Sequence, residues 1–293
     1  DTEVAAVLIG KLYQGDLVKA VEKAIERIEG NFAFGVISLD HPGLLVGARR
    51  GSPLAVGVQA QGAGMILASD AMPILAHTRH VLYLDDEQVV ALEANKLTLR
   101  QHGKEVEPKV QELHWTAEDA ERGGYPHFML KEIHEQPGAL RRLASSLVAS
   151  PGSMAQGIAP SFNLQNLPLN DDEIRRISRV VIVAQGTAFH AGLVGRNMIE
   201  RTARVPVSVE YGSDFRYRDP VIDPSVLVIA ISQSGETADT LGAVRLARER
   251  GCKTLAVINA VGSTIARESD GVIYMNVGPE IGVASTKAFT GQI

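Results

Sequence analysis

The stretch that decides the fold reads VLVIAISQSGET, residues 226–237. Its first six residues are aliphatic and mostly β-branched, which is typical of a strand buried on both faces of a sheet. Beyond the polar residues that follow, the apolar side chains of Leu241, Val244 and Ala247 recur at helical spacing. The stretch therefore predicts a strand, a polar loop and a helix.

The polar loop, residues 232–237, has the composition of an anion-binding turn. It holds three hydroxyl groups, the amide of Gln233 and one glycine, and it contains no lysine or arginine. Backbone N–H groups at the start of a helix attract anions, helped by the helix macrodipole. The hydroxyls of Ser232, Ser234 and Thr237 would complete a donor set around a phosphate. The alternative is that Ser234 or Thr237 only caps the helix.

A second loop, Gln185-Gly186-Thr187-Ala188, also follows a buried strand and precedes a helix. Between residues 180 and 276 about five strand patterns alternate with helical ones, which predicts an α/β, doubly wound parallel sheet. Ligands of such sheets bind outside the carboxyl ends of the strands, where the strand order reverses. We therefore expect the two loops to meet at one ligand. Neither loop is a Walker A or a dinucleotide motif, which leaves a small phosphate ester.

Composition limits the function classes. A chain of 293 residues exceeds the roughly 150 residues of one domain, so two domains are expected. A net charge of -5 offers no basic surface for nucleic acid. The single cysteine, Cys252, forms no intrachain disulfide and is expected to pack in the core of a cytoplasmic protein. The sequence contains no apolar run of about 18 residues, so a membrane segment is not expected. It opens with no leader, so secretion is not expected. Since the chain starts with Asp1 and stops inside an expected helix, we expect a fragment.

The first half alternates short strand patterns with hairpin turns after two helical segments, which predicts an α+β arrangement. Polar residues and breakers predict a linker at residues 106–127. Helical spacing from Phe128 to Val148 predicts two helices with a break near Gln136-Pro137. His77 and His80 lack companion ligands, so no metal site is expected. The charges of Arg49, Arg50 and Asp70 could suggest a site, but solvated loop charges are an equally open reading.

Several long motifs carry a resemblance to one enzyme family. They are the stretch SQSGETADT at residues 232–240, FRYR at 215–218 with Glu210, EIGVASTKAFT at 280–290 and KEIHEQP at 131–137. In this order they resemble the isomerising glutamine:fructose-6-phosphate aminotransferases. The resemblance implies that residues 1–105 are the later part of an N-terminal-nucleophile glutaminase domain. It also implies that residues 128–293 are most of a first sugar isomerase (SIS) domain.

The resemblance also implies roles for individual residues. It places Thr187, Ser232, Gln233, Ser234 and Thr237 around the sugar phosphate. Two further residues are expected to form the opposite wall of the pocket, Val283 and Ser285; core packing is the alternative for Val283. Asp1 is expected to bind the amino group of glutamine, although an exposed cap is equally open. No cofactor is implied.

The chain departs from the family pattern in two ways. Gln185 and Ala188 replace a cysteine and a serine of the usual Cys-Gly-Thr-Ser, which removes one pocket hydroxyl. The nucleophilic cysteine of the family would precede Asp1, and the enolising glutamate, the ring-opening histidine and a lysine would follow Ile293. No catalytic residue is therefore expected within the chain.

The resulting hypothesis is a fragment of a homodimeric aminotransferase that binds fructose 6-phosphate but does not turn it over. The alternatives are a non-catalytic sugar-phosphate sensor and another SIS-domain isomerase or deglycase. The sensor is disfavoured because no helix-turn-helix pattern or basic patch occurs. Another SIS-domain isomerase or deglycase is disfavoured because it would not explain why the chain carries its first half.

Overall fold

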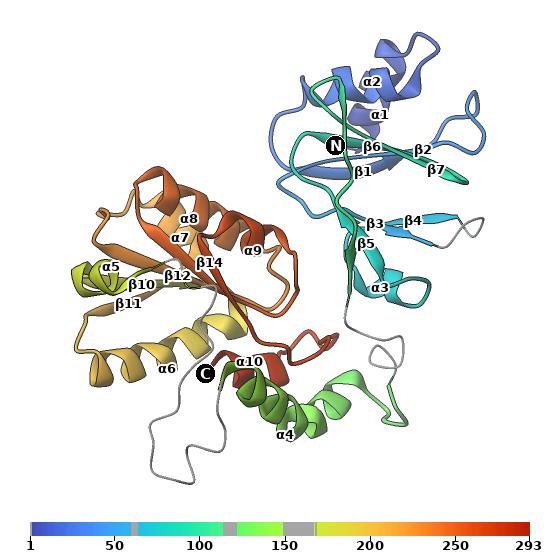
Figure 1. Cartoon of the computed structure of the whole chain (residues 1–293). Coiled ribbons are helices and arrows are strands. Elements are labelled where there is room, and N and C mark those ends of the chain that lie inside the picture. The colour runs from blue at the N-terminus through green and yellow to red at the C-terminus, as the bar shows by residue number, and fades with distance from the viewer. Residues whose placement is uncertain (1, 60–63, 114–121, 149–166, 168) are drawn as a thin grey trace. The chain divides into compact units, whose positions relative to one another are not determined.

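The computed structural model describes residues 2–59, 64–113, 122–148, 167 and 169–293 (Figure 1). Asp1 lies outside the described residues. The chain divides into two compact units, residues 1–120 and 121–293. Each unit contains its own sheets, so each is described by itself.

The first unit consists of helices and two antiparallel sheets. One sheet has the order β1-β2-β6-β7-β8 and the other β4-β3-β5-β9. The elements are α1 (Thr2–Leu12), α2 (Leu17–Ile25), β1 (Phe32–Val36), β2 (Leu45–Arg50), β3 (Ala55–Val58), β4 (Met65–Ala68), α3 (Met72–Leu75), β5 (His80–Tyr83), β6 (Gln88–Glu93), β7 (Lys96–Gln101), β8 (Lys104–Val106) and β9 (Gln111–Glu112). The α+β prediction and its hairpins are confirmed, with strand bounds that differ by a few residues.

Alternation along the strands stacks these elements in layers. Val46 and Val89 pack against the helices α1 and α2. Their chain neighbours Leu45 and Val90 point to the opposite face and pack against the second sheet. The far face of that sheet covers α3 through residues such as Ala55. Period-two alternation thus produces the layer order helix, sheet, sheet, helix.

The solvated reading of Arg49 and Arg50 is wrong, and a short strand falls within the range predicted as linker. That strand is β9, which pairs with β5 and lies within residues 106–127. A two-residue strand is too short to show a strand pattern in sequence. Arg49 is only 1% exposed and its guanidinium lies 2.9 Å from Asp86. Arg50 pairs with Glu87. These two arginines are therefore held by long-range ion pairs and are not solvated.

The second unit is built on a five-stranded parallel sheet of order β11-β10-β12-β13-β14. Its elements are α4 (Phe128–Leu147), α5 (Asp171–Arg176), β10 (Arg179–Ala184), α6 (Gly186–Thr202), β11 (Val207–Tyr211), α7 (Gly212–Tyr217), β12 (Val226–Ser232), α8 (Ala238–Glu249), β13 (Lys253–Ile258), α9 (Thr264–Glu268), β14 (Gly271–Tyr274) and α10 (Lys287–Gln292). The predicted doubly wound sheet is confirmed. The decisive strand is its centre, since β12 pairs with β10 and β13.

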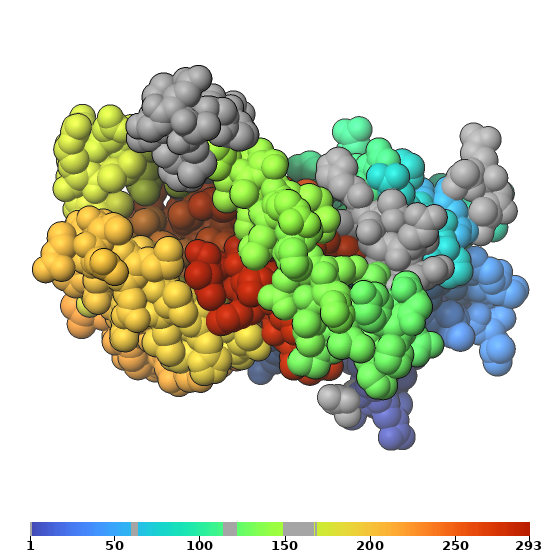
Figure 2. All heavy atoms as spheres, turned by 90° about the horizontal axis from the view of Figure 1, so that it is seen from below, coloured from blue at the N-terminus to red at the C-terminus, as the bar shows by residue number. Residues whose placement is uncertain are grey.

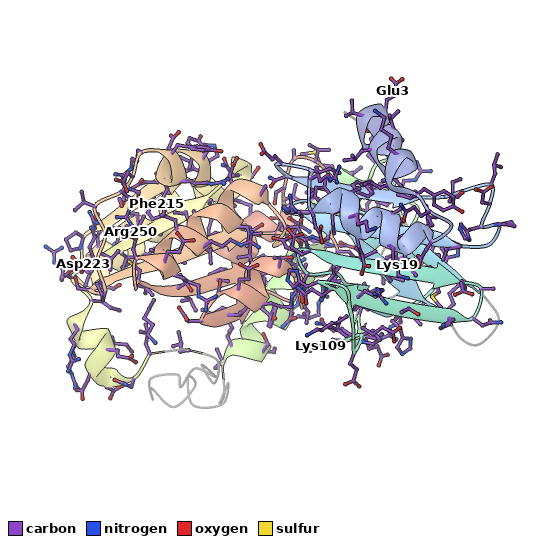
Figure 3. The ribbon with its side chains drawn as sticks, turned by 90° about the horizontal axis from the view of Figure 1, so that it is seen from above. Glu3, Lys19, Lys109, Phe215, Asp223 and Arg250 are labelled. Atoms are coloured by element: carbon purple, nitrogen blue, oxygen red, sulfur yellow. The ribbon has the colours of Figure 1, made fainter. Side chains whose placement is uncertain are left out.

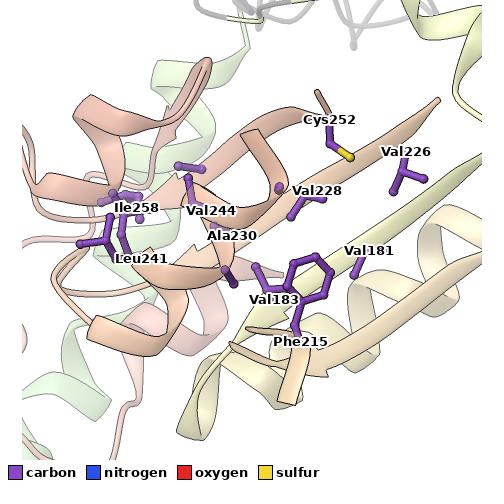
Figure 4. Close-up of a cluster of buried hydrophobic side chains, with 14 of the residues drawn as sticks. Val181, Val183, Phe215, Val226, Val228, Ala230, Leu241, Val244, Cys252 and Ile258 are labelled. Atoms are coloured by element: carbon purple, nitrogen blue, oxygen red, sulfur yellow. The ribbon is translucent and has the colours of Figure 1, made fainter. Parts of the chain in front are cut away.

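Helices cover both faces of this sheet. On one face Val228 and Ala230 pack with Phe215 of α7 and Leu241 of α8 (Figure 4). On the other face Leu227 and Ile231 pack with residues of α6 such as Phe189. Cys252 lies in the first of these clusters, 3% exposed, where its thiol contacts the Asp223 carbonyl oxygen at 3.2 Å. Burial raises the pKa of this thiol, so it is a packing residue.

One continuous helix replaces the predicted pair around Pro137. α4 runs from Phe128 to Leu147 with Pro137 inside it. A proline in a helix interior leaves the carbonyl four residues earlier without its N–H partner. That carbonyl belongs to Ile133, and the side-chain amide of Gln136 donates to it at 3.2 Å. The glutamine thus supplies a replacement donor, which the sequence pattern did not indicate.

None of the helices in the described part of the chain has the length and apolarity required to cross a membrane.

The cap of α2 gives a test of the first unit. Asp16 accepts the backbone N–H of Lys19, which lies on α2 (Figure 3), at 3.0 Å. This hydrogen bond, the largest of the causes, lowers the pKa of Asp16. Asp16→Ala should lower the free energy of unfolding by about 1 kcal/mol at pH 7.

The stabilisation by this cap is complete above the unfolded pKa of about 3.9 and is lost as the pH falls through the lower folded value. The difference between the two chains in urea unfolding should therefore shrink below pH 3 to 4. An unchanged difference at low pH would contradict the cap. Lys23→Ala, one helical turn further on, serves as the surface control.

Candidate functional site

The site forms where two neighbouring strands send their helices to opposite faces. The strand order, in chain order of the five strands, is 2-1-3-4-5, and the reversal lies between β10 and β12. After β10 the chain enters α6 on one face, and after β12 it enters α8 on the other. The carboxyl ends of these strands therefore open into a crevice, the usual place for a ligand in such sheets.

A pocket of about 260 Å³ occupies this crevice. All seven residues predicted for sugar phosphate line it: Thr187, Ser232, Gln233, Ser234, Thr237, Val283 and Ser285. The structure thus brings together three segments separated by up to about 100 positions in sequence. The other described residues of the lining are Gln185, Gly186, Ala188, Ile231, Glu280, Gly282 and Gln292.

The first segment is the start of a helix and not the loop that the sequence suggested. α6 begins at Gly186, and only Gln185 precedes it as the N-cap. The first N–H groups of a helix have no partner within the helix. Thr187 and Ala188 belong to this first turn, so the pocket is lined by a helix start with free donor capacity and its positive dipole end. Hence α6 contributes backbone donors as well as a hydroxyl.

The second segment, residues 232–237, is a turn held by its own hydroxyls. Ser232 Oγ accepts the Gly235 N–H at 3.0 Å and lies 3.3 Å from Thr237 Oγ1. Ser234 Oγ accepts the Glu236 N–H at 3.2 Å. Because Ser234 acts as an acceptor within the turn, its own O–H hydrogen is available to a ligand. The turn therefore combines internal rigidity with an outward donor.

The third segment forms the wall. Val283 is fully exposed, at 104% of its reference area, so the alternative of core packing is wrong for this residue. Ser285 donates its hydroxyl to Glu280 at 2.7 Å. The Glu280 carboxylate also accepts the N–H groups of Thr286 at 2.8 Å and Ala288 at 3.2 Å. It therefore caps the start of α10 and fixes the wall from inside.

The electrostatics of the pocket come from dipoles and not from cations. Among the described lining residues only Glu280 is ionisable. Its carboxylate accepts hydrogen bonds from the backbone N–H groups at the start of α10. The remaining donors are hydroxyls and the starts of α6 and α8. Such an arrangement binds an anion through hydrogen bonds and helix dipoles.

Sequence reasoning missed four lining residues: Ile231, Glu280, Gly282 and Gln292. Glu280 opens the quoted motif, and a carboxylate followed five and six residues later by hydroxyls was the available signal of a helix cap. Gln292 lies on the last turn of α10, and its Oε1 is buried without a hydrogen-bond partner among the described residues. No sequence signal pointed to Gln292, since it enters the pocket only through the packing of α10.

Other motif residues stabilise the surroundings. Glu210 and Arg218 form a bidentate pair at 2.7 and 2.8 Å outside the pocket. Gln185, which replaces the family cysteine, donates its amide to Asp239 at 3.2 Å. Within the described ranges no group of three or more His, Cys, Asp or Glu is arranged to hold a metal.

Comparison with known proteins relates the second unit to a domain family. Residues 173–293 match the SIS domain family. The C-terminal domain of glucosamine-fructose-6-phosphate aminotransferase from Francisella tularensis is similar in structure, with a TM-score of 0.51 and 40% identity over 59% of this chain and 46% of that chain.

The whole chain has curated relatives. It is 47% identical to a glutamine–fructose-6-phosphate aminotransferase (isomerizing) from Symbiobacterium thermophilum and 42% identical to one from Caldanaerobacter subterraneus. Each alignment covers 100% of this chain and 47% of the relative. The chain therefore spans about half the length of the curated relatives that it matches, and the resemblance noted from the sequence motifs is confirmed.

The turn at Gly235 gives a test of the site geometry. Gly235 has φ +66, and a Cβ there would lie 2.0 Å from Ser263 Oγ. Gly235→Ala should lower the free energy of unfolding of the second unit by at least about 1 kcal/mol, because the positive φ and the close contact both disfavour a Cβ. Urea unfolding measures the change.

Gly195→Ala on α6 is the matched control. A Cβ at Gly195 would make an ordinary contact at 3.7 Å with Ile182, and Gly195 sits in a helix interior. This change should raise the free energy of unfolding by up to about 1 kcal/mol. Equal effects of the two alanines would contradict the described turn.

Proposed function

We propose that this chain is part of an isomerising glutamine–fructose-6-phosphate aminotransferase and that its SIS domain binds a hexose phosphate, with fructose 6-phosphate as the ligand. The observation that carries the proposal is the pocket of hydroxyls and helix starts at the switch point of the sheet. A phosphate fits the donor set of residues 186–188 and 232–237, which lies where doubly wound sheets bind ligands. The sugar would extend toward Val283 and Ser285.

The first unit supports the aminotransferase over other proteins with SIS domains. Relatives that carry this activity in their names match 100% of the chain, residues of the first unit included. A sugar-phosphate sensor or a different isomerase would account for the SIS domain alone. We therefore assign residues 1–105 to a glutaminase domain that acts on glutamine in the complete enzyme, with Asp1 as a glutamine-binding residue. Cytoplasmic location, homodimer formation and the absence of nucleic-acid partners belong to the same proposal.

Titration calorimetry with fructose 6-phosphate and with fructose tests the ligand. The unaltered chain should bind the phosphate ester and not the free sugar. Ser234→Ala removes an outward donor and should weaken binding of the ester roughly tenfold, as expected for a lost hydrogen bond to a charged group.

Ser225→Ala is the matched control, because Ser225 lies at the amino end of β12 and its hydroxyl contacts that of Ser178 at 2.6 Å. This variant should keep the affinity of the unaltered chain. Equal binding of fructose and its phosphate would refute the assignment of the pocket.

Turnover by the chain alone is a separate prediction. The resemblance assigns no nucleophile for amide attack and no base for proton transfer at carbon to any residue of this chain, and the reaction needs both. Incubation with glutamine and fructose 6-phosphate should therefore yield no glucosamine 6-phosphate. Its appearance in a steady-state assay would show that the catalytic groups have been assigned wrongly.

A further inference from the structure

A buried carboxylate on α4 fastens the wall of the pocket from behind. Glu132 is 2% exposed. Its Oε1 accepts the N–H groups of Ile281 at 2.7 Å and of Gly282 at 3.1 Å. Val283, the next residue, projects at the pocket lining. Two consecutive amides of the wall are therefore fixed by one side chain nearly 150 residues away in sequence.

The contact is closely fitted on both sides. A Cβ on Gly282 would lie 2.6 Å from Glu132 Oε2, so only glycine lets the carboxylate approach this far. Buried amides without a partner are costly, and a charged acceptor makes stronger hydrogen bonds than a neutral one. The wall therefore has one favoured position relative to α4.

A second tie lies one turn further along α4. Lys287, 2% exposed, places its Nζ 2.5 Å from Glu135 Oε2. Lys131 Nζ lies 3.5 Å from Glu135 Oε1. The two ties hold both ends of the segment 281–287. Figure 2 shows the atoms of α4 lying over those of the C-terminal segment, in agreement with Figure 1.

No residue of α4 is among the described lining of the pocket, so α4 acts on a ligand indirectly, and the two ties described above act through the wall. We propose that Glu132 is a positioning residue for the sugar part of the ligand, because it sets where Val283 and Ser285 stand. This inference rests on the proposed function. The pocket then has two sides that are held independently. The phosphate side consists of residues 186–188 and 232–237, and the sugar side contains Val283 and Ser285.

The phosphate side does not depend on Glu132. Its turn is held by the hydrogen bond from Gly235 N to Ser232 Oγ and by Glu236, whose carboxylate accepts the N–H and the hydroxyl of Thr264 at 2.6 and 2.8 Å. Loss of Glu132 should therefore weaken the binding of a sugar phosphate while leaving the binding of inorganic phosphate almost unchanged.

The test compares these two ligands on the full chain by titration calorimetry. Glu132→Ala should weaken binding of fructose 6-phosphate on the order of tenfold, since it removes the acceptor of two part-buried amides. It should change the affinity for inorganic phosphate less than about twofold. Glu132→Gln keeps one acceptor oxygen and should restore part of the affinity. Gly282→Ala disturbs the same contact from the other side and should resemble Glu132→Ala.

Hydrogen exchange gives a readout that does not need a ligand. The amides of Ile281 and Gly282 should exchange faster in Glu132→Ala, while those of residues 232–237 keep their rates. Asp270→Ala is the matched control. Its carboxylate also accepts a backbone N–H, from Thr254 at 2.9 Å, but at the amino edge of the sheet. Asp270→Ala should change neither the affinity for fructose 6-phosphate nor that for inorganic phosphate.

The outcomes separate the two proposals. Unchanged affinity of Glu132→Ala for fructose 6-phosphate, or an equal loss for both ligands, overturns the positioning role alone. An affinity loss of the same size in Asp270→Ala also overturns it, since general destabilisation would then explain the effect. Failure of the unaltered chain to bind fructose 6-phosphate overturns the proposed function, and the positioning role with it.

Discussion

The burial of β12 on both faces is the constraint on which the site depends. Residues 226–231 are apolar because they face helices on both sides of the sheet. The chain must leave this strand at its carboxyl end, and the helices after β10 and β12 leave to opposite faces. The crevice between them is a consequence of this winding. Polar residues placed directly after the two strands then meet without any need for long loops.

Carboxylates around the pocket hold two of its three segments in place, the turn 232–237 and the wall. Glu236 accepts hydrogen bonds from Thr264 at the start of α9, Glu280 from the start of α10, and Glu132 from the wall amides. Each is an acceptor matched to backbone donors that would otherwise lack partners. Because these backbone donors are already paired, the hydroxyl hydrogen of Ser234 and the N–H groups at the start of α6 remain to bind a ligand.

Much of this was predictable from local patterns. The strands of the parallel sheet and the turn 232–237 follow from periodicity and loop composition, whereas the set of seven pocket residues is what the family resemblance implies. What sequence patterns missed depends on long-range contacts. The single helix through Pro137 depends on Gln136, and the buried Arg49 depends on Asp86. The place of Gln292 in the pocket depends on how α10 packs, and sequence spacing carries no record of that packing.

The distribution of charge explains how an acidic chain can offer an anion site. The carboxylates closest to the pocket already accept hydrogen bonds from backbone N–H groups, and these N–H dipoles offset their negative charge. The pocket itself faces the N-terminal, positive dipole ends of α6 and α8. Attraction by helix dipoles falls off within about one turn, whereas attraction by a lysine or arginine reaches to about the Debye length. Recognition here must therefore act at contact distance. Affinity then depends on how well hydroxyls and amides are placed, which makes the groups that position the wall as important as those that touch the ligand.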